Sequence, residues 1–443
     1  MSTLSTLKTL TLALAIAINR TQATVVVPYV SYIGPGPLGV PNEFVRNPVN
    51  ESGGMFQGRF GIHLAIGAPP QHVWVAPHFY DSETYVKSAS LCENSTQIEI
   101  CESGYSGIFA ANESSTFEGS NGSSFGRDTV SGFDAVPDLK NDEFKFGIQT
   151  TDEPNFVGQD WGTLGLGPNS TFLQTFFPGK EQVGIYYTGG NSTHGKPAHS
   201  IPPRPLVIYE LEFDGYNQSH FMGDKFTQPI GPPSPLSNSS NPFTLNVTSI
   251  VVGRKEILGG DSYIATVDLS GRTSNIFPSS VYKSFVDATG AAIINGMPAY
   301  DIHNLPSTSI PDELYNLTIS FINGNRGFTV TIPQEFYISY IQGLDPDHAV
   351  ANILNADDPL VKQSWPDKGP VIALNQLMFT SYIGIDHAAG EWWLARAVHP
   401  WDEPANNNTA EPKENAAAGG IGDNLRKAMG AAAAFATAVV LLC

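Results

Sequence analysis

A segment early in the chain, residues 60–86 (FGIHLAIGAPPQHVWVAPHFYDSETYV), constrains the fold more than any other part of the sequence. Apolar residues alternate between Phe60 and Leu64 with the two-residue period of a half-buried β-strand. Residues 67–70, Gly-Ala-Pro-Pro, predict a turn, because proline fixes φ and lacks the N–H that a strand ladder needs. Residues 73–75 resume an apolar run of β-branched and aromatic side chains. The segment therefore predicts a β-hairpin.

The composition fits a large β protein better than a helical one. A chain of 443 residues exceeds what one small core needs and suits two β-rich lobes. Glycine (43) and proline (33) are frequent and charged residues make up only 15%, which favours short strands joined by many turns. The formal net charge of −19 argues against a nucleic-acid partner, which needs a basic face. It suits an extracellular protein, and simple solubility explains it equally well.

Three cysteines are few for a secreted chain of this length. Cys92 and Cys101 are close in the sequence, which predicts a disulfide that closes one short loop. The alternative is a metal site, but no histidine lies near either residue in the sequence. Cys443 is the last residue and belongs to a tail that we expect to be removed.

Residues 1–23 have the pattern of a secretory signal peptide. Lys8 precedes an apolar stretch, and the small residues that end at Ala23 offer a cleavage site. A short core helix is the alternative. Residues 24–55 follow as an N-terminal strand, expected at a sheet edge over residues 24–27, and a Gly/Pro-rich connector.

The end of the chain differs in composition from the rest. Residues 401–427 are rich in Asn, Ala, Gly and Glu without apolar periodicity, which predicts a disordered stalk and spacer. Residues 428–443 are mostly apolar but shorter than the roughly 20 residues of a membrane-spanning helix. Small residues from Asn415, a polar spacer and the apolar end together predict a GPI-anchor signal with Asn415 as the attachment residue. A tail anchor and a loosely associated C-terminus are the alternatives.

Triplets of the form Asn-x-Ser/Thr are frequent, which predicts a glycosylated surface, although some such triplets arise by chance. The acceptor residues are Asn50, Asn94, Asn112, Asn121, Asn169, Asn191, Asn217, Asn238, Asn246, Asn316 and Asn407.

The hairpin segment resembles the first active-site hairpin of the pepsin-like aspartic proteases. That family has hydrophobic-Gly-Thr-Pro-Pro-Gln, six residues, Asp-Thr/Ser-Gly, and a short run that ends in Trp-Val. Here Ile66–Gln71 and Tyr85–Val86 match without a gap, and His78-Phe79-Tyr80 occupies the Asp-Thr-Gly position. The scaffold motif is present and the catalytic triplet is not.

Further segments similar to this family follow in the same order along the chain. The resemblance implies an all-β, bilobal pepsin-like acid protease fold, with two lobes related by a pseudo-two-fold and a cleft between them. It places the lobes at residues 56–190 and 206–400, with a connector at 191–205. In the family, a glycine-rich segment passes beneath the first active-site loop. The similar segments are residues 109–117, 125–130, 161–167 (the glycine-rich one), 213–221, 265–274 and 374–386.

Two further departures from the family lie near the expected cleft. The flap that closes over substrate is cut to residues 118–125 and contains no tyrosine. In the second catalytic loop Asp268 is present, but Leu269 is inserted before the Ser-Gly that should follow. The first loop is also similar to a fungal branch of the family that itself lacks the first catalytic aspartate, because Pro77 and residues 83–86 fit that branch.

Aspartic proteases use two facing carboxylates that share one proton and activate a water. Asp268 is the candidate for one of them, and an aspartate that only bonds its own turn is the alternative. His78 at the other position cannot accept a proton in its cationic form, in which we expect it to pair with Asp268. Asp81 would restore a carboxylate only after a three-residue slip of the hairpin.

The remaining histidines suggest no other chemistry. His194, His199 and His220 lie in polar loops without metal-ligand spacing, so we expect them to be solvated. We expect no metal and no cofactor.

These features predict a secreted, glycosylated and GPI-anchored pepsin-like protein that has lost peptidase activity. Its expected role is binding or wall structure at the fungal cell surface, with a peptide or glycan in the interlobe cleft and the chain as a monomer. One alternative is an active acid endopeptidase that uses Asp268 with an unconventional partner. Another is a structural wall glycoprotein with a filled cleft.

Overall fold

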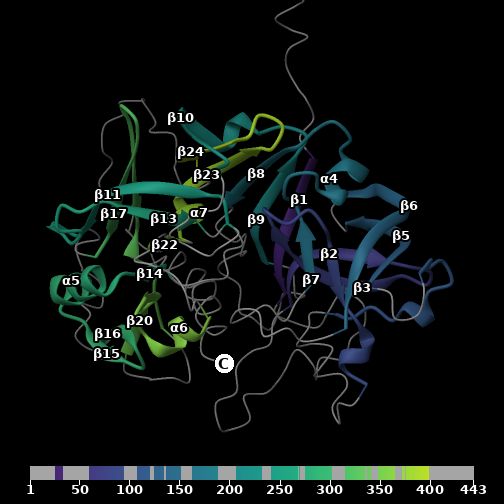
Figure 1. Ribbon diagram of the computed structural model, residues 1–443, viewed down its shortest axis with the longest axis horizontal. Helices are drawn as coiled ribbons and strands as arrows, with labels where there is room; N and C mark the ends of the chain where they lie inside the picture. Colours follow the sequence, from purple (N-terminus) through teal and green to yellow (C-terminus); the bar gives the residue numbers. More distant parts are fainter. Residues whose placement is uncertain are drawn as a thin grey trace, which may run out of the picture.

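The computed structural model of the chain is mostly β-structure with a few short helices (Figure 1). This confirms the all-β class expected from the composition. The described residues are 25–32, 59–93, 107–119, 124–133, 136–150, 162–187, 206–231, 241–267, 269, 275–301, 315–334, 337–340, 348–364, 372–374 and 376–398.

Twelve strands form the largest sheet. They are β1 (Val25–Tyr32), β2 (Arg59–Ile66), β3 (Gln71–His78), β4 (Tyr85–Lys87), β5 (Phe125–Phe133), β6 (Val136–Gln149), β7 (Gly162–Gly165), β8 (Gln182–Tyr187), β9 (Leu206–Phe213), β10 (Phe221–Pro229), β23 (Ser381–Asp386) and β24 (Glu391–Ala397). Their order is β10-β24-β23-β8-β9-β1-β2-β3-β7-β4-β6-β5. Strands from both predicted lobes therefore share one sheet.

Two smaller sheets come from the second half of the chain. The strands of the eight-stranded sheet are β11 (Thr244–Val252), β12 (Lys255–Glu256), β13 (Tyr263–Val267), β14 (Asn275–Phe277), β17 (Leu317–Asn323), β18 (Arg326–Ile332), β21 (Ile353–Asn355) and β22 (Ile372–Leu374). Their order is β18-β17-β11-β13-β22-β14-β21, and β12 pairs with β11. The four-stranded sheet consists, in spatial order, of β15 (Ala292–Ile294), β16 (Met297–Asp301), β20 (His348–Ala351) and β19 (Ile338–Tyr340).

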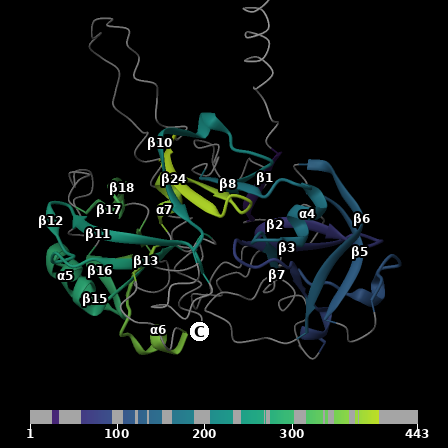
Figure 2. The same cartoon turned by 45° about the horizontal axis from the view of Figure 1, so that its top comes forward.

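The helices are short and lie between strands. They are α4 (Thr171–Phe176), α5 (Ser279–Thr289), α6 (Pro359–Ser364) and α7 (Leu377–Thr380), with 3-10 turns η1 (Ala89–Leu91), η2 (Ala111–Glu113) and η3 (Gln218–His220). Figures 1 and 2 both show β2, β3 and β7 on one side of the molecule and β11 and β13 on the other, with β8 and β24 between them.

Strands β2 and β3 form the predicted hairpin. Ile66 pairs with Gln71 in an antiparallel register, and residues 67–70 make the turn. Gly67 has a φ of +87°, and a Cβ there would lie 2.6 Å from Oγ of Ser114. Only glycine fits this conformation and this contact. The hairpin and its turn are therefore confirmed.

The strand expected at a sheet edge over residues 24–27 continues to Tyr32; residues 25–27 have a described partner in β9, and β2 pairs with residues 30–32. Strand β1 pairs with β2 on one side and with β9 on the other, where Val27 lies opposite Leu211. The second partner comes from a segment far along the chain, which local periodicity does not reveal.

One buried apolar cluster joins the hairpin to the eight-stranded sheet. It includes Ile62 and Val75 of the hairpin, Leu245 and Val267 of the eight-stranded sheet, and Trp392 of β24, each at most 1% exposed. The ends of β3 and β13, where the two catalytic loops are expected, therefore rest on a common core.

Candidate functional site

The first loop, residues 79–84, connects β3 to β4 and is held from below by the segment that follows β7. The N–H of Leu166 donates to the carbonyl oxygen of His78 at 2.8 Å. A Cβ at Gly167 would lie 2.5 Å from the carbonyl carbon of Tyr80, so this close approach requires glycine. The glycine-rich segment was expected to pass beneath this loop, and the expectation is confirmed.

His78 ends β3 and forms a hydrogen bond with a carboxylate in its own loop. Its Nδ1 lies 2.5 Å from Oδ2 of Asp81, and the two side chains are 12% and 46% exposed. The carboxylate accepts, so Nδ1 carries the hydrogen of this bond. We expected a pair with Asp268, which lies outside the described residues; the partner found is Asp81. His78 pairs with Gly165 of β7 in parallel register.

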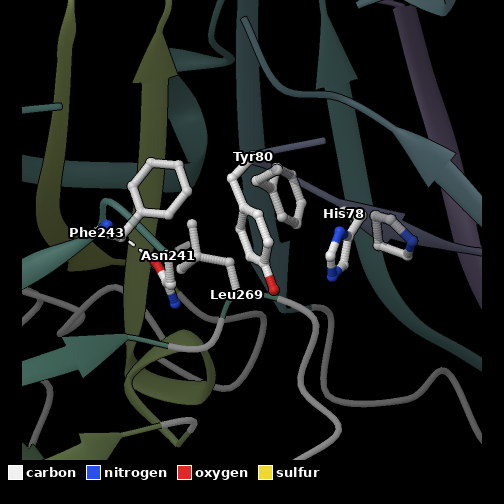
Figure 3. Close-up of a pocket in the computed structure, with 7 residues that line it drawn as sticks. His78, Tyr80, Asn241, Phe243 and Leu269 are labelled. Atoms are coloured by element: carbon white, nitrogen blue, oxygen red, sulfur yellow. Dashed lines mark hydrogen bonds between the residues drawn. The ribbon is translucent and has the colours of Figure 1, made fainter. Parts of the chain in front are cut away.

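A small pocket lies where the first loop meets the second half of the chain. In Figure 3 the ring of Tyr80 lies between His78 and Leu269, and the centroids of the His78 and Tyr80 rings are 4.2 Å apart. Phe79 and Leu269 are only 2% and 3% exposed. The pocket has a cavity volume of only about 10 Å³ and is lined by Pro77, His78, Phe79, Tyr80, Asn241, Phe243 and Leu269. Its lining is therefore mostly aromatic and apolar.

The amide of Asn241 is committed to the backbone around the pocket. Its Nδ2 donates to the carbonyl oxygen of Val267 at 2.9 Å, and its Oδ1 accepts from the N–H of Phe243 at 2.9 Å. These bonds tie the start of β11 to the end of β13. Asn241 thus shapes the pocket wall and offers little to a ligand.

The second loop, residues 268–274, connects β13 to β14 and is one residue longer than the first. This agrees with the inserted Leu269, which is the one residue of this loop that the structure describes. Asp268, the candidate catalytic residue, lies outside the described residues.

The two loops are carried by strands with the same pairing pattern. Strand β7 lies between β3 and β4, parallel to β3 and antiparallel to β4. Strand β22 lies between β13 and β14, parallel to β13 and antiparallel to β14. Pro77 pairs with Leu164 in the first motif, and Val267 pairs with Leu374 in the second. Each motif also continues with a parallel strand, β6 beside β4 and β21 beside β14.

The segment expected to be a shortened flap, residues 118–125, leads into β5. Glu118 and Arg127 exchange two backbone hydrogen bonds of 2.8 and 2.9 Å, which close the segment between them. Residues 120–123 within it lie outside the described residues. The chain therefore brings no flap tyrosine to the pocket from the described part of this turn.

A second histidine–carboxylate pair lies in the twelve-stranded sheet. Nδ1 of His220 lies 2.5 Å from Oε1 of Glu212, whose side chain is 0% exposed. Oε2 accepts from the hydroxyl of Tyr382 and the N–H of Asn217, each at 2.5 Å. The His220 ring stacks on Tyr186 at 3.9 Å between centroids. The expectation that His220 is solvated is wrong, because a buried carboxylate needs donors and the turn after β9 supplies this one. No sequence pattern marks the pair.

His387, in the turn between β23 and β24, touches the support of the first loop. Its Nε2–H donates to the carbonyl oxygen of Leu166 at 2.7 Å. Burial lowers the pKa of His387, although the bond to Leu166 and the charges of Glu181 and Asp386 act in the opposite direction. The ring is therefore neutral at pH 7, with its hydrogen on Nε2. The sequence gives no sign of this link.

Cys92 is 1% exposed and disulfide-bonded. Its expected partner, Cys101, lies outside the described residues, so that pairing stays a prediction. The same holds for the signal peptide, the connector, the stalk and the tail. Other predicted positions outside the described residues are Asn50, Asn94, Asn121, Asn191, Asn238, Asn407, Asn415, His194 and His199.

Five predicted glycan acceptors lie within the described residues. Asn112 and Asn169 are exposed, whereas Asn246 and Asn316 are partly buried. Nδ2 of Asn217, the atom that would carry a sugar, lies 3.2 Å from Nε2 of a histidine ring in the buried pair. Exposure therefore favours the first two acceptors.

Searches for other sites and for relatives give negative results. Among the described residues, no group of three or more His, Cys, Asp or Glu side chains is placed to hold a metal ion. In that same part of the chain, no helix is both long and apolar enough to cross a membrane. Neither a known protein family nor a curated protein matches this sequence.

Proposed function

We propose that this chain is a noncatalytic, bilobal member of the pepsin-like aspartic protease family that binds a ligand between its lobes. The repeated strand pattern of the two loops carries the proposal. The residues that follow the paired Pro77 and Val267 are His78 and Asp268, so a histidine occupies one of two equivalent positions. Two loops on equivalent strands are what a pseudo-two-fold fold requires, and only one of them retains a carboxylate at this point.

The surroundings of His78 support the loss of peptidase activity. Two carboxylates about 3 Å apart share a proton because both cannot ionise, and this sharing lets them activate water. His78 replaces one carboxylate with an imidazole that is already bonded to Asp81. A buried water also needs about two to four polar partners, whereas Phe79 and Leu269 bring apolar side chains to the pocket.

Digestion of a denatured protein substrate across acidic to neutral pH, with and without pepstatin, tests the proposal. We expect no cleavage by the purified protein. His78→Asp should also be inactive, because Phe79 and Tyr80 still replace the Thr/Ser-Gly turn of the family. Pepstatin-sensitive cleavage that Asp268→Asn abolishes would overturn the proposal.

An active endopeptidase that uses Asp268 with an unconventional partner is the second candidate, and one observation favours it. The His78–Asp81 pair has the imidazole–carboxylate arrangement of a general base. This function requires that cleavage be present in the same digestion and be lost in both His78→Gln and Asp268→Asn. A wild-type protein that cleaves no substrate in this digestion excludes the endopeptidase function.

We further propose that the protein is secreted, glycosylated and held at the cell surface by a GPI anchor. The support is the sequence pattern at the two ends of the chain and the exposure of Asn112 and Asn169. Phosphatidylinositol-specific phospholipase C should release the protein from membranes. Recovery of an intact C-terminal peptide that contains Cys443 from the mature protein would contradict the anchor.

A further inference from the structure

We propose that His387 is a pH-sensitive switch: its neutral ring fixes residues 166–167 beneath the first loop, and its protonated ring releases them. His387 lies in the turn between β23 and β24, in the sheet that strands from both predicted lobes share. The switch acts on the backbone that supports the first loop, so it is independent of whether that loop binds a ligand.

The neutral ring belongs to a series of hydrogen bonds that ends in the first loop. Nε2–H of His387 donates to the carbonyl oxygen of Leu166 at 2.7 Å. The N–H of Leu166 donates to the carbonyl oxygen of His78 at 2.8 Å, and the N–H of Gly167 donates to that of Asp81 at 2.7 Å. The oxygen that His387 bonds and the N–H that bonds Asp81 belong to the same planar peptide group, so a movement of one displaces the other.

The second nitrogen of the ring makes this arrangement sensitive to protonation. Nδ1 of His387 is shielded from solvent and has no hydrogen-bond partner among the described residues. In the neutral ring Nδ1 is an unused acceptor, whereas in the protonated ring it is an N–H donor that carries charge. A buried donor without an acceptor costs about 1–3 kcal/mol, and more when the group is charged. The protonated ring is therefore unstable in this position.

Two carboxylates act on the ring, Asp386 at the end of β23 and Glu181 just before β8. Asp386 already accepts from the N–H of Ala389 at 2.9 Å and from Nε2 of Gln182 at 2.6 Å. Within the described part of the chain, the Glu181 side chain accepts no hydrogen bond. The segment after β7 presents the neutral carbonyl of Leu166. We therefore expect the protonated ring to turn towards Glu181, which breaks the bond to Leu166.

The switch is closed at neutral pH and opens in acid. Burial lowers the pKa of His387, although the bond to Leu166 and the charges of Glu181 and Asp386 act in the opposite direction. An exposed histidine has a pKa of about 6.5, so the open form takes up the proton at a higher pH than the closed form. Between about pH 6.5 and the pKa of the closed form, the equilibrium constant for opening therefore rises by up to about tenfold per pH unit.

Hydrogen exchange at the Leu166 and Gly167 amides, measured by NMR on the intact protein, tests the proposal. Protection of these amides, corrected for the intrinsic pH dependence of exchange, should fall by up to about tenfold per pH unit as the pH decreases below about 6.5. The N–H of Ile257, which donates to the carbonyl oxygen of Ile250 at 2.8 Å, is the control and should keep its protection. Constant protection at Leu166 and Gly167, or an equal fall at Ile257, would overturn the proposal.

Three variants assign the effect to this ring. His387→Gln keeps a donor for Leu166 and does not titrate, so protection should no longer depend on pH. Glu181→Gln removes the charge that attracts the protonated ring, so opening should begin at a lower pH. Glu143→Gln, at an exposed residue of β6, should leave the profile unchanged. A loss in acid that His387→Gln retains, or identical profiles in Glu181→Gln and Glu143→Gln, would overturn the assignment.

The digestion assay is independent of these exchange measurements. Cleavage of the denatured substrate would refute the proposed function and leave the switch intact. Constant amide protection without cleavage would refute the switch alone.

Discussion

Two histidine–carboxylate pairs in this protein have the same N–O distance of 2.5 Å and very different surroundings. At the pocket, Asp81 is 46% exposed and bonds to His78. In the twelve-stranded sheet, Glu212 is 0% exposed, and His220 is one of three donors to its oxygens. The same chemical pair therefore serves a candidate binding site in one place and the packing of the fold in the other. The two pairs differ in role because the carboxylate of Glu212 is buried and that of Asp81 is not.

The energies expected for the two pairs differ accordingly. A solvent-exposed ion pair contributes about 0–1 kcal/mol, because water screens it and side-chain entropy opposes it. Removing one partner of a buried pair costs about 3–5 kcal/mol, because the other partner stays buried without compensation. The pocket pair can thus rearrange around a ligand at little cost, whereas the sheet pair is fixed.

The largest effect should come from Glu212→Ala. We expect the free energy of unfolding to fall by about 3–5 kcal/mol, because His220 and Tyr382 lose their buried acceptor. Urea denaturation followed by circular dichroism measures this change. Asp81→Ala is the matched control and should cost about 0–1 kcal/mol. Equal losses in the two variants would remove the distinction between the pairs.

A single hydroxyl tests the buried network more finely. Tyr382→Phe deletes the O–H that donates to the Glu212 carboxylate and should cost about 1.5–3 kcal/mol, the range for a hydrogen bond to a charged group. Tyr216→Phe deletes an O–H that donates to the neutral carbonyl of Ile385 at 2.8 Å and should cost about 0.5–1.5 kcal/mol. A larger loss in Tyr216→Phe would show that Glu212 does not carry the stability assigned to it.

His387 provides a third case, a buried histidine with a carbonyl partner. Burial lowers its pKa in the folded state, whereas the unfolded chain has an ordinary value of about 6.5. As the pH falls below about 6.5, the unfolded state binds the proton first, so stability is complete above that pH and decreases towards the folded pKa. His387→Gln keeps a donor for Leu166 and does not titrate.

The variant should therefore flatten the pH dependence of unfolding in this window. The wild-type slope from this one group reaches at most about 1.4 kcal/mol per pH unit. Urea midpoints measured from pH 7.5 downwards in both proteins test this. A wild-type profile that rises as the pH falls through this window, and that His387→Gln leaves unchanged, would contradict the assignment.

The sequence predicted the features that depend on local pattern and close backbone contact. The hairpin follows from alternating apolar residues and the prolines of its turn, and the need for glycine at Gly67 and Gly167 follows from contacts of 2.6 and 2.5 Å that any side chain would make. Each of these features depends on one short segment of the sequence.

The features that the sequence did not predict depend on residues that are far apart in the chain or that no sequence pattern marks. Strand β1 as a whole lies inside the sheet, because β9 pairs along it and β2 pairs with residues 30–32. Glu212, His220 and Tyr382 come from β9, η3 and β23 and meet only after the sheet forms. From the sequence, Asp81 is a candidate only for the missing catalytic carboxylate. Its hydrogen bond to His78, three residues earlier in the chain, depends on the backbone conformation of the loop, which the residue types do not reveal.

The smallest change in stability, and the most informative one for the pocket, is expected for Asp81→Asn. The exposed position should limit the loss to about 0–1 kcal/mol. The chemistry should change more, because an asparagine amide can donate to Nδ1, which lets the ring carry its hydrogen on Nε2. Nε2 then donates instead of accepting.

Urea denaturation measures the stability of the variant, and nitrogen NMR of the His78 ring shows which ring nitrogen carries the hydrogen. A loss above about 2 kcal/mol would place Asp81 with the buried pair. A hydrogen that stays on Nδ1 in the variant would mean that Asp81 does not set the hydrogen position on His78. The expected result, little lost stability with a changed hydrogen position on His78, separates this exposed pair from the buried one, whose disruption should cost about 3–5 kcal/mol.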